Sequence, residues 1–144
     1  MNSSSPKHSV SVAAAIVDDH GRVLATRRRD NGHWEPPGGV LELDESIEDG
    51  LVREVLEETG LLVRPLRLTG VYKNMVRGIV ALVFRCEVVE RETAVSDEVG
   101  EIRWFPPSQL GERMEEAYAI RMLDAIHGGR PRVRAHDGRS LLRS

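Results

Sequence analysis

The chain has 144 residues, of which 40% are hydrophobic and 30% charged, with a net charge of −3. This length and composition are typical of one globular domain and are too small for two ordinary ones. No segment approaches the roughly 18 consecutive apolar residues of a membrane span, and residues 1–9 lack the apolar segment of a secretory signal. We therefore expect a cytoplasmic protein that does not cross a membrane.

Charge is distributed unevenly along the chain. Residues 128–144 contain five arginines and one aspartate, so this tail carries +4 and the preceding 127 residues carry −7. An acidic body with a basic tail argues against a stable nucleic-acid complex, which needs a basic face on the folded domain. It is compatible with a small anionic substrate bridged by a metal ion.

Cys86 is the only cysteine, so it cannot form an internal disulfide, and its apolar neighbours predict a buried thiol.

The first elements are predicted from period-2 alternation. Residues 10–16 alternate as a strand, the turn residues 18–21 predict a hairpin, and residues 22–29 form the second strand. Residues 30–39 are expected to be an irregular, rigid loop. Within residues 34–39, two prolines fix φ and remove donors, while two glycines let the backbone approach other groups closely.

A helix is predicted over about residues 46–59, with Ser46 as N-cap and Gly60 as the left-handed residue at its end. Further strands are expected over residues 61–72, 79–89 and 102–105, and a final helix over about 112–127. Residues 128–144 have no persistent period. We therefore predict one domain over residues 1–127 with a loosely docked basic extension over 128–144, and an α+β fold whose sheet has helices on both sides.

The predicted helix has two different faces. Four apolar residues fall within an arc of about 140° and are expected to pack on the sheet: Leu51, Val52, Val55 and Leu56. Glu54, Glu57 and Glu58 share an arc of about 100° on the other side. Carboxylates this close raise one another's pKa unless a cation lies among them, and oxygen ligands suit Mg²⁺ or Mn²⁺. The alternative is a solvated acidic face.

Two further residues of this helix stand beside the acidic face. Gly50 costs about 1 kcal/mol relative to alanine inside a helix, so we expect the proline-glycine loop to cross close over this turn. The alternative is a harmless substitution. Arg53 can reach Glu57 at i+4 or a loop carboxylate such as Glu45, which indicates an orienting role.

Nine residues of this region follow the pattern G-x5-E-x7-R-E-U-x-E-E-x-G-U without a gap, where U is apolar: Gly39, Glu45, Arg53, Glu54, Val55, Glu57, Glu58, Gly60 and Leu61. The segment resembles the signature of the Nudix (MutT-like) hydrolases. The resemblance implies an α/β/α sandwich with a mixed central sheet, and a Nudix domain over residues 1–127. It also implies attack of water on a phosphorus of a nucleoside diphosphate linked to a group X, which yields a nucleoside monophosphate and phosphate-X.

The resemblance implies roles for the matching residues. The metal ligands for Mg²⁺ or Mn²⁺ would be the Gly39 carbonyl and three carboxylates: Glu54, Glu57 and Glu58. Glu45 and Arg53 would brace the loop and the helix. One departure is Gly50, where the family often has alanine.

The general base is either a glutamate of the signature or an acid outside it. Glu57 therefore competes with Asp97, Glu98 and Glu101. Related enzymes often place an extra acidic metal ligand shortly before the position of Trp104. We expect Glu98 to serve as base and additional ligand.

The substrate is predicted less sharply. Arg27 and Arg29 share a face by period 2 and are expected to meet phosphate, the alternative being a solvated charge run. Tyr72, and less so Trp34 and Trp104, could stack on a base, although each is more often a packing residue. We expect a nucleoside or deoxynucleoside triphosphate. The alternatives are ADP-ribose or an NDP-sugar, and a non-catalytic nucleotide-binding regulator; a homodimer is also open.

Overall fold

The computed structural model describes residues 5–143 except 92–98, with the backbone alone at residues 91, 99 and 100. The strands in the described part are β1 Ser9–Ile16, β2 Val23–Arg28, β3 Trp34–Glu35, β4 Gly38–Val40, β5 Leu61–Asn74, β6 Ile79–Arg91, β7 Val99–Phe105 and β8 Arg132–His136. The helices are α1 Ile47–Thr59, a 3₁₀ turn at Pro107–Gln109, α2 Leu110–Arg113 and α3 Glu116–His127. None of the described helices has the length and hydropathy needed to cross a bilayer.

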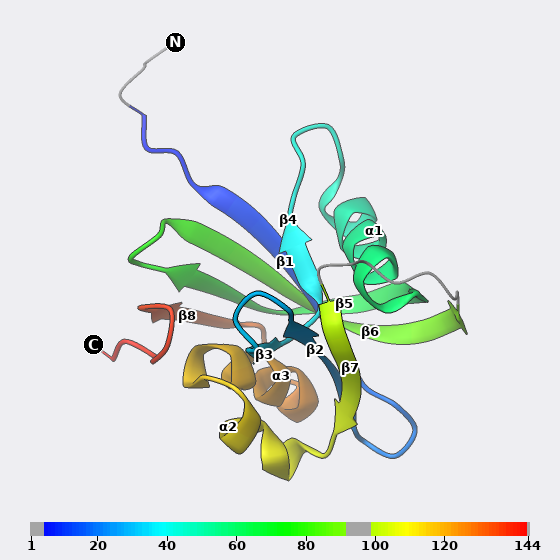
Figure 1. The fold of residues 1–144 in the computed structure, drawn as a ribbon. Coiled ribbons are helices and arrows are strands. Elements are labelled where there is room, and N and C mark those ends of the chain that lie inside the picture. The colour runs from blue at the N-terminus through cyan, green and yellow to red at the C-terminus, as the bar shows by residue number, and fades with distance from the viewer. Residues whose placement is uncertain (1–4, 92–98, 144) are drawn as a thin grey trace.

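Two sheets form the middle layer of a sandwich. The larger sheet has the order β4-β1-β6-β5-β8, with β1/β6 and β5/β8 parallel and β1/β4 and β5/β6 antiparallel. The smaller sheet has the order β3-β2-β7 and is antiparallel. Figure 1 shows α1 above the strands and α2 and α3 below them. The predicted α+β class, with a mixed central sheet between helices, is confirmed.

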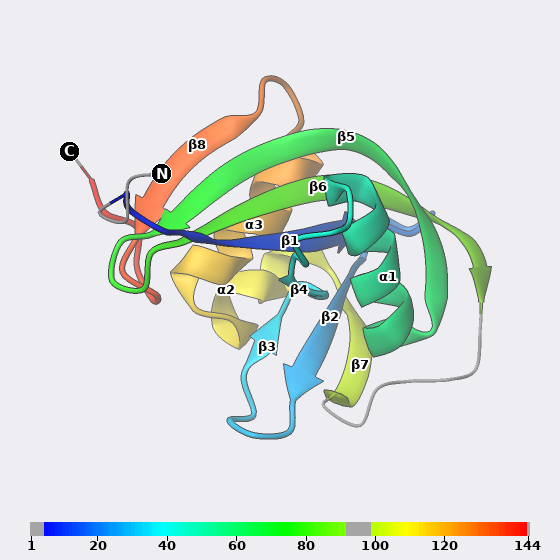
Figure 2. The same ribbon diagram turned by 90° about the horizontal axis from the view of Figure 1, so that it is seen from above.

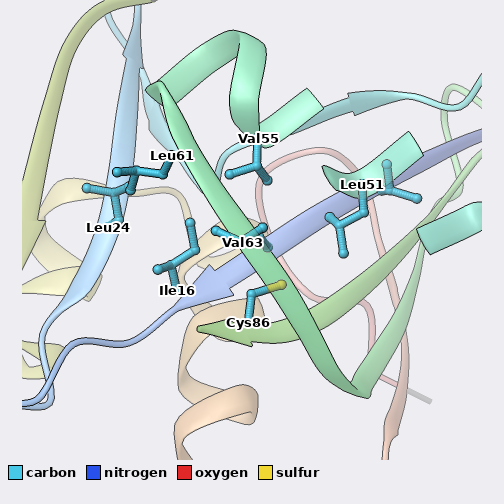
Figure 3. Packing of buried hydrophobic residues seen from close by; sticks show 9 residues of the cluster. Ile16, Leu24, Leu51, Val55, Leu61, Val63 and Cys86 are labelled. Atoms are coloured by element: carbon cyan, nitrogen blue, oxygen red, sulfur yellow. The ribbon is translucent and has the colours of Figure 1, made fainter. Parts of the chain in front are cut away.

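Apolar clusters on the two faces of the strands attach these helices. The α1 cluster joins Leu51 and Val55 of the helix to Ile16 of β1, Leu24 of β2 and Val63 of β5 (Figure 3). A thiol belongs to the same cluster, since Cys86 is 1% exposed, as predicted. On the opposite face, α3 packs on the other side of β1. The strand is buried on both faces because it lies inside a sheet covered by helices.

The predicted hairpin after β1 is only partly correct. Val17 and Val23 form an antiparallel bridge, and the Asp18 N–H donates to the Arg22 carbonyl at 2.9 Å. Beyond this turn β2 leaves the sheet of β1 and pairs with β3 and β7. The turn chemistry is local, whereas the choice of partner strand depends on which sheet can bury both faces of β2.

The prediction of an irregular loop over residues 30–39 is wrong at two places, because β3 and β4 lie within it. The prolines fall between these short strands, and the glycines after them can pair with β1. A Cβ at Gly38 would lie 2.1 Å from the Val12 carbonyl oxygen, so only glycine permits this approach.

The single final helix predicted over 112–127 is divided. Met114 and Glu115 have extended backbones with ψ of 154° and 149°, and they separate α2 from α3. The break allows Leu110 and Met114 to enter the same apolar cluster as Met122 of α3. Burial of these side chains outweighs the propensity for one continuous helix.

The expectation of a loosely docked tail is also wrong. Residues 132–136 form β8, which runs parallel to β5 from Gly70 opposite Arg132 to Asn74 opposite His136; Figure 2 shows it at the outer edge of the sheet. The tail is anchored by charge as well, since Arg134 donates to both carboxylate oxygens of Asp124 in α3 at 2.8 Å. A segment without apolar periodicity is thus held by backbone pairing and by a buried ion pair.

Candidate active site

Helix α1 begins and ends as predicted. Ser46 has extended backbone angles and its hydroxyl accepts a hydrogen bond from the Asp49 N–H at 3.2 Å. Gly60 adopts φ 72°, and its N–H donates to the Leu56 carbonyl. Both ends of the helix are therefore fixed by local interactions.

The acidic face of α1 is organised around Arg53. Its Nε and Nη2 donate to the two carboxylate oxygens of Glu45 at 2.9 and 2.7 Å. Its Nη1 lies 3.1 Å from Glu54 Oε1 and 3.3 Å from Glu57 Oε2. The Arg53 guanidinium, helped by the Glu42 backbone N–H, lowers the pKa of Glu45 to about 2. The predicted contacts of Arg53 with Glu45 and Glu57 are therefore present.

The backbone of the glycine pair lies against two carboxylates of α1. The Gly38 N–H donates to Glu58 Oε1 at 3.3 Å, and a Cβ at Gly39 would lie 2.3 Å from Glu54 Oε2. Burial raises the pKa of Glu58 to about 8, since the Gly38 hydrogen bond only partly opposes it. Burial also raises the pKa of Glu54, against the effect of Arg53. The loss of solvent around Glu54 and Glu58 therefore disfavours their ionised forms more than Arg53 and the Gly38 N–H favour them.

The donors present fit a hard divalent cation. Within the described part of the chain, no three acidic, histidine or cysteine side chains are gathered as a closed metal site. Glu54 and Glu58 nevertheless flank the glycine backbone, and half-exposed Glu57 lies on the same face with 56% of its side chain accessible. Carboxylate and carbonyl oxygens beside buried, uncompensated charge are the ligands that such ions prefer.

Gly50 excludes a side chain, as predicted, but for another reason. A Cβ there would lie 2.4 Å from Leu41 Cδ1 and 2.8 Å from Glu45 Oε1. The segment that follows β4, and not the proline-glycine loop, crosses this turn of α1.

Comparisons with known proteins identify the fold that carries this site. A family model described as NUDIX domain matches residues 7–126. The chain belongs to the Nudix family. A MutT-like protein of Streptomyces ambofaciens is 57% identical over 139 residues, which cover 96% of this chain and 90% of that protein. An ADP-ribose pyrophosphatase of Methanocaldococcus jannaschii is 30% identical over 110 residues, which cover 72% of this chain and 65% of that protein.

Solved structures of other proteins share this fold. A Nudix hydrolase from Nitrosomonas europaea superposes with a TM-score of 0.77 at 28% identity, covering 87% of this chain and 93% of that one. An ADP-ribose pyrophosphatase from Streptococcus suis has the same TM-score at 21% identity, covering 88% and 99%, and supports the fold alone. The chain is a Nudix pyrophosphohydrolase that acts on nucleoside diphosphate-linked substrates, and Nudix hydrolases generally use divalent metal ions.

The candidate bases outside the Nudix signature fall in different places. Asp97 and Glu98 lie outside the described residues. Glu101 is near Arg103 and 3.7 Å from Arg27. It lies on the face of β7 opposite α1, because its neighbour Ile102 packs on the α1 cluster. Glu101 is therefore excluded as a base beside α1.

The arginines after β2 are arranged differently from the prediction. Arg27 donates from Nε to the Gly32 carbonyl at 3.1 Å and lies 6.0 Å from the Trp34 ring, on the face away from α1. Arg28 instead lines a cavity with the Nudix glycines, and its Nη1 lies 3.5 Å from Glu35. Alternation from Leu24, which faces α1, would have indicated Arg28. Arg29 is exposed just after β2, and its contact with phosphate stays a prediction.

The prediction that Tyr72 binds substrate is wrong. Its side chain is completely buried, and its hydroxyl donates to Asp124 Oδ2 of α3 at 2.7 Å. Burial raises the pKa of Tyr72, with Asp124 acting in the same direction. The two tryptophans pack as well, Trp34 edge-on to Phe105 with centroids 5.0 Å apart and Trp104 on the α1 cluster.

A cavity of about 300 Å³ extends from the Nudix glycines toward α3. It is lined by residues that sequence reasoning missed: Arg28, Glu35, Tyr118 and Arg121. Burial raises the pKa of Glu35, and Arg28 opposes the rise. A larger groove of about 550 Å³ shares Glu35 and Tyr118 with it. In the sequence, Arg121 could have drawn attention, because it is a charged residue next to the apolar stripe of the final helix. Its spacing gave no indication that it lies near the acidic site.

Proposed function

We propose that this Nudix hydrolase cleaves a pyrophosphate bond of a nucleoside or deoxynucleoside triphosphate, with Mg²⁺ or Mn²⁺ held by the Gly39 carbonyl, Glu54, Glu57 and Glu58. The observation that carries the proposal is the pair of partly buried carboxylates, Glu54 and Glu58, against the glycine backbone. A putative 8-oxo-dGTP diphosphatase of Bacillus subtilis, 29% identical over 96 residues, is a relative whose name gives a triphosphate substrate. The intact carboxylates argue against a binding module without catalysis.

The side chains have distinct parts in the proposed reaction. A bound divalent cation neutralises phosphate oxygens and lowers the pKa of bound water. Glu54 and Glu58 must be ionised to bind it, so binding displaces the proton that burial favours on Glu58. Glu45 and Arg53 keep the loop and α1 in register through their paired hydrogen bonds. Arg28, at the cavity wall, is placed to contact phosphate.

Glu98 is proposed as the general base, with exposed Glu57 as the alternative. Loss of a general base lowers turnover by about 100-fold to 10,000-fold. Glu98→Gln is expected to show this loss while Glu101→Gln, on the opposite face of β7, keeps normal turnover. Full activity of Glu98→Gln would remove it as base, and a comparable loss in Glu57→Gln would favour Glu57.

The proposed role of the α1 glutamates as metal ligands is tested with the double variant Glu57→Gln and Glu58→Gln at saturating Mg²⁺. Loss of several kcal/mol of transition-state stabilisation corresponds to a fall in kcat/KM of about 1000-fold. Glu48→Gln, an exposed carboxylate in the first turn of α1, is the matched control and should be normal. Phosphate release unchanged in the double variant would show that these carboxylates do not bind the metal.

A panel of nucleoside triphosphates, NDP-sugars and ADP-ribose, assayed with Mg²⁺ and with Mn²⁺, tests the substrate. We expect the highest kcat/KM with a triphosphate. Preference for ADP-ribose, the substrate named for the relative at 30% identity, would replace the triphosphate assignment. Binding without turnover of any compound would indicate a regulator. A homodimer and a cytoplasmic location stay predictions.

A further inference from the structure

The cavity beside Gly38 and Gly39 ends at the buried guanidinium group of Arg121. Arg121 of α3 is 8% exposed and lines this cavity together with Gly38 and Gly39. Its guanidinium carbon lies 4.8 Å from the Tyr118 ring centroid and 5.4 Å from that of Tyr72. The rings stabilise the cation but supply no hydrogen-bond acceptor in the plane of the guanidinium.

Arg121 lacks the counter-charge that buried arginines usually have. In the part of the chain that the structure describes, no carboxylate lies within ion-pair distance of it, and its Nε is buried without a hydrogen-bond partner. Glu35 lines the same cavity but is engaged 3.5 Å from Arg28. Asp124, one turn along α3, accepts from Arg134 and Tyr72. A buried charge without a partner destabilises a protein and calls for an explanation.

The contact with His136 does not supply the missing acceptor. Arg121 Nη2 lies 3.3 Å from His136 Nε2, while the Gly138 N–H donates to His136 Nδ1 at 2.9 Å. Because Nδ1 accepts that bond, the neutral imidazole carries its proton on Nε2. The imidazole N–H and the guanidinium N–H therefore face each other as two donors. The contacts of the Arg121 guanidinium among the described side chains are thus two tyrosine rings and the His136 N–H, and none of them is a carboxylate.

We propose that Arg121 is a specificity-determining residue that donates hydrogen bonds to an acceptor oxygen of the substrate, at the end remote from the metal-bound phosphates. This inference rests on the proposed function, because it takes the cavity beside Gly39 as the place of the group attached to those phosphates. The oxygen belongs either to a nucleobase carbonyl or to an anionic group. His136 comes from β8, beyond the residues 7–126 that match the family, so the tail helps to form this subsite.

The test compares Arg121→Met with wild type on ITP and ATP, whose bases differ at one exocyclic group, a carbonyl oxygen against an amino group. Loss of a charged hydrogen bond predicts a KM about 10-fold to 100-fold higher. A rise with ITP alone assigns a base carbonyl, and an equal rise with both nucleotides assigns an anionic oxygen; either supports the proposal. An unchanged KM with both would overturn it.

Thermal stability separates recognition from a structural role. Since no carboxylate among the described residues pairs with buried Arg121, Arg121→Met should unfold at the same temperature as wild type or a higher one. The matched control is Arg134→Met, which breaks the bonds to Asp124 and should lower the unfolding temperature without changing KM. A folded state lost or strongly destabilised by Arg121→Met would overturn the proposal.

Binding of IMP and AMP, measured by calorimetry without turnover, distinguishes failure of the inference from failure of the proposed function. If wild type hydrolyses none of the nucleotides but loses nucleotide affinity on Arg121→Met, the proposed function fails and the subsite stands. If hydrolysis is normal and neither KM nor affinity depends on Arg121, the function stands and the subsite fails.

Discussion

Helices α1 and α3 cover opposite faces of the same strands, yet they handle charge in opposite ways (Figure 1). On α1, partly buried Glu54 and Glu58 lie beside glycine backbone, and the loss of solvent raises the pKa of both despite Arg53 and the Gly38 N–H. On α3, buried Arg121 lies beside tyrosine rings and a histidine N–H with no acceptor. Among the described residues, the α1 face therefore lacks a cation that would balance its carboxylates, and the α3 face lacks a carboxylate that would accept hydrogen bonds from Arg121.

A substrate with a metal-bound phosphate end and an oxygen-bearing far end would compensate both faces. One cavity is lined by both Arg121 and Gly39, and Gly39 lies against the carboxylate of Glu54. Uncompensated buried charge lowers the stability of the free protein, which is consistent with sites that strain the fold in order to bind. The remaining buried charge of α3, Asp124, differs because Tyr72 and Arg134 satisfy it within the fold. Variants can distinguish buried charges that bind the substrate from buried charges that stabilise the fold.

The largest effect is expected from deleting residues 130–144, which removes β8 and leaves Asp124 buried without Arg134. Breaking a buried ion pair costs about 3–5 kcal/mol, a large part of the roughly 5–15 kcal/mol that stabilises a domain. Circular dichroism should show no cooperative unfolding transition. Deleting residues 143–144 is the control, because the Arg143 side chain is 75% exposed and its ion pair with Glu116 is weak. A truncated chain that unfolds like wild type would show that the tail is only an appendage.

The two adjacent glycines should separate folding from activity. A Cβ at Gly38 meets backbone atoms of Val12 and Ala13, so Gly38→Ala should cost about 3 kcal/mol in the free energy of unfolding. The three atoms nearest to a Cβ at Gly39 all belong to the carboxylate of Glu54, which can swing away. Gly39→Ala should therefore keep its stability and lose about 10-fold to 100-fold in kcat/KM. Equal stability losses in both variants would contradict the separation.

The two faces should respond oppositely to pH when divalent ions are absent. The pKa of Glu58 is raised from 4.5 to about 8 by burial, so its stabilising contribution is present at acid pH and is lost as pH rises through about 8. The pKa of His136 is lowered from 6.5, first by burial and then by Arg121, so its contribution is present above 6.5 and is lost as pH falls. Thermal unfolding measured across pH should show both losses.

Glu58→Gln should remove only the alkaline loss of stability, and saturating Mg²⁺ should reduce that loss in wild type, because the cation binds the ionised carboxylate. An alkaline loss that persists unchanged in Glu58→Gln would assign it to another group.

The smallest effect is expected for Tyr72→Phe. The substitution removes one hydrogen bond to Asp124, which keeps both bonds from Arg134, so the free energy of unfolding should fall by about 1–2 kcal/mol. KM for the nucleotide should not change, because the ring is completely buried. A raised KM with unchanged stability would restore Tyr72 as a substrate contact.

Most of the acidic site was predictable because its relations are local. Spacings of three and four residues on a capped helix place Glu54, Glu57 and Glu58 on one face whatever surrounds the helix. The Arg53 pair with Glu45 was predicted from reach alone. Gly50 shows the limit, since its need for a small residue was inferred correctly but the neighbouring segment was not.

The substrate end was not predictable from the same kind of pattern. Tyr72 was a reasonable stacking residue in an alternating strand, and its burial depends on α3, whose Asp124 and Ala125 lie more than fifty residues away in the sequence. Arg28 was separated from Arg27 and Arg29 only when the smaller sheet showed which face meets the cavity. Each of these assignments needs the position of a partner element.

By itself the sequence determined the helix, its caps and its acidic face, because backbone hydrogen bonds within a helix impose one spacing on its side chains. The bond that the enzyme breaks was inferred from the resemblance to the Nudix family. The tertiary structure alone decided that β2 joins a second sheet, that the basic tail is an edge strand, and that buried Arg121 meets two tyrosine rings and a histidine, with no carboxylate among the described residues in ion-pair distance. Strand partners and buried contacts depend on long-range burial, which no local pattern encodes.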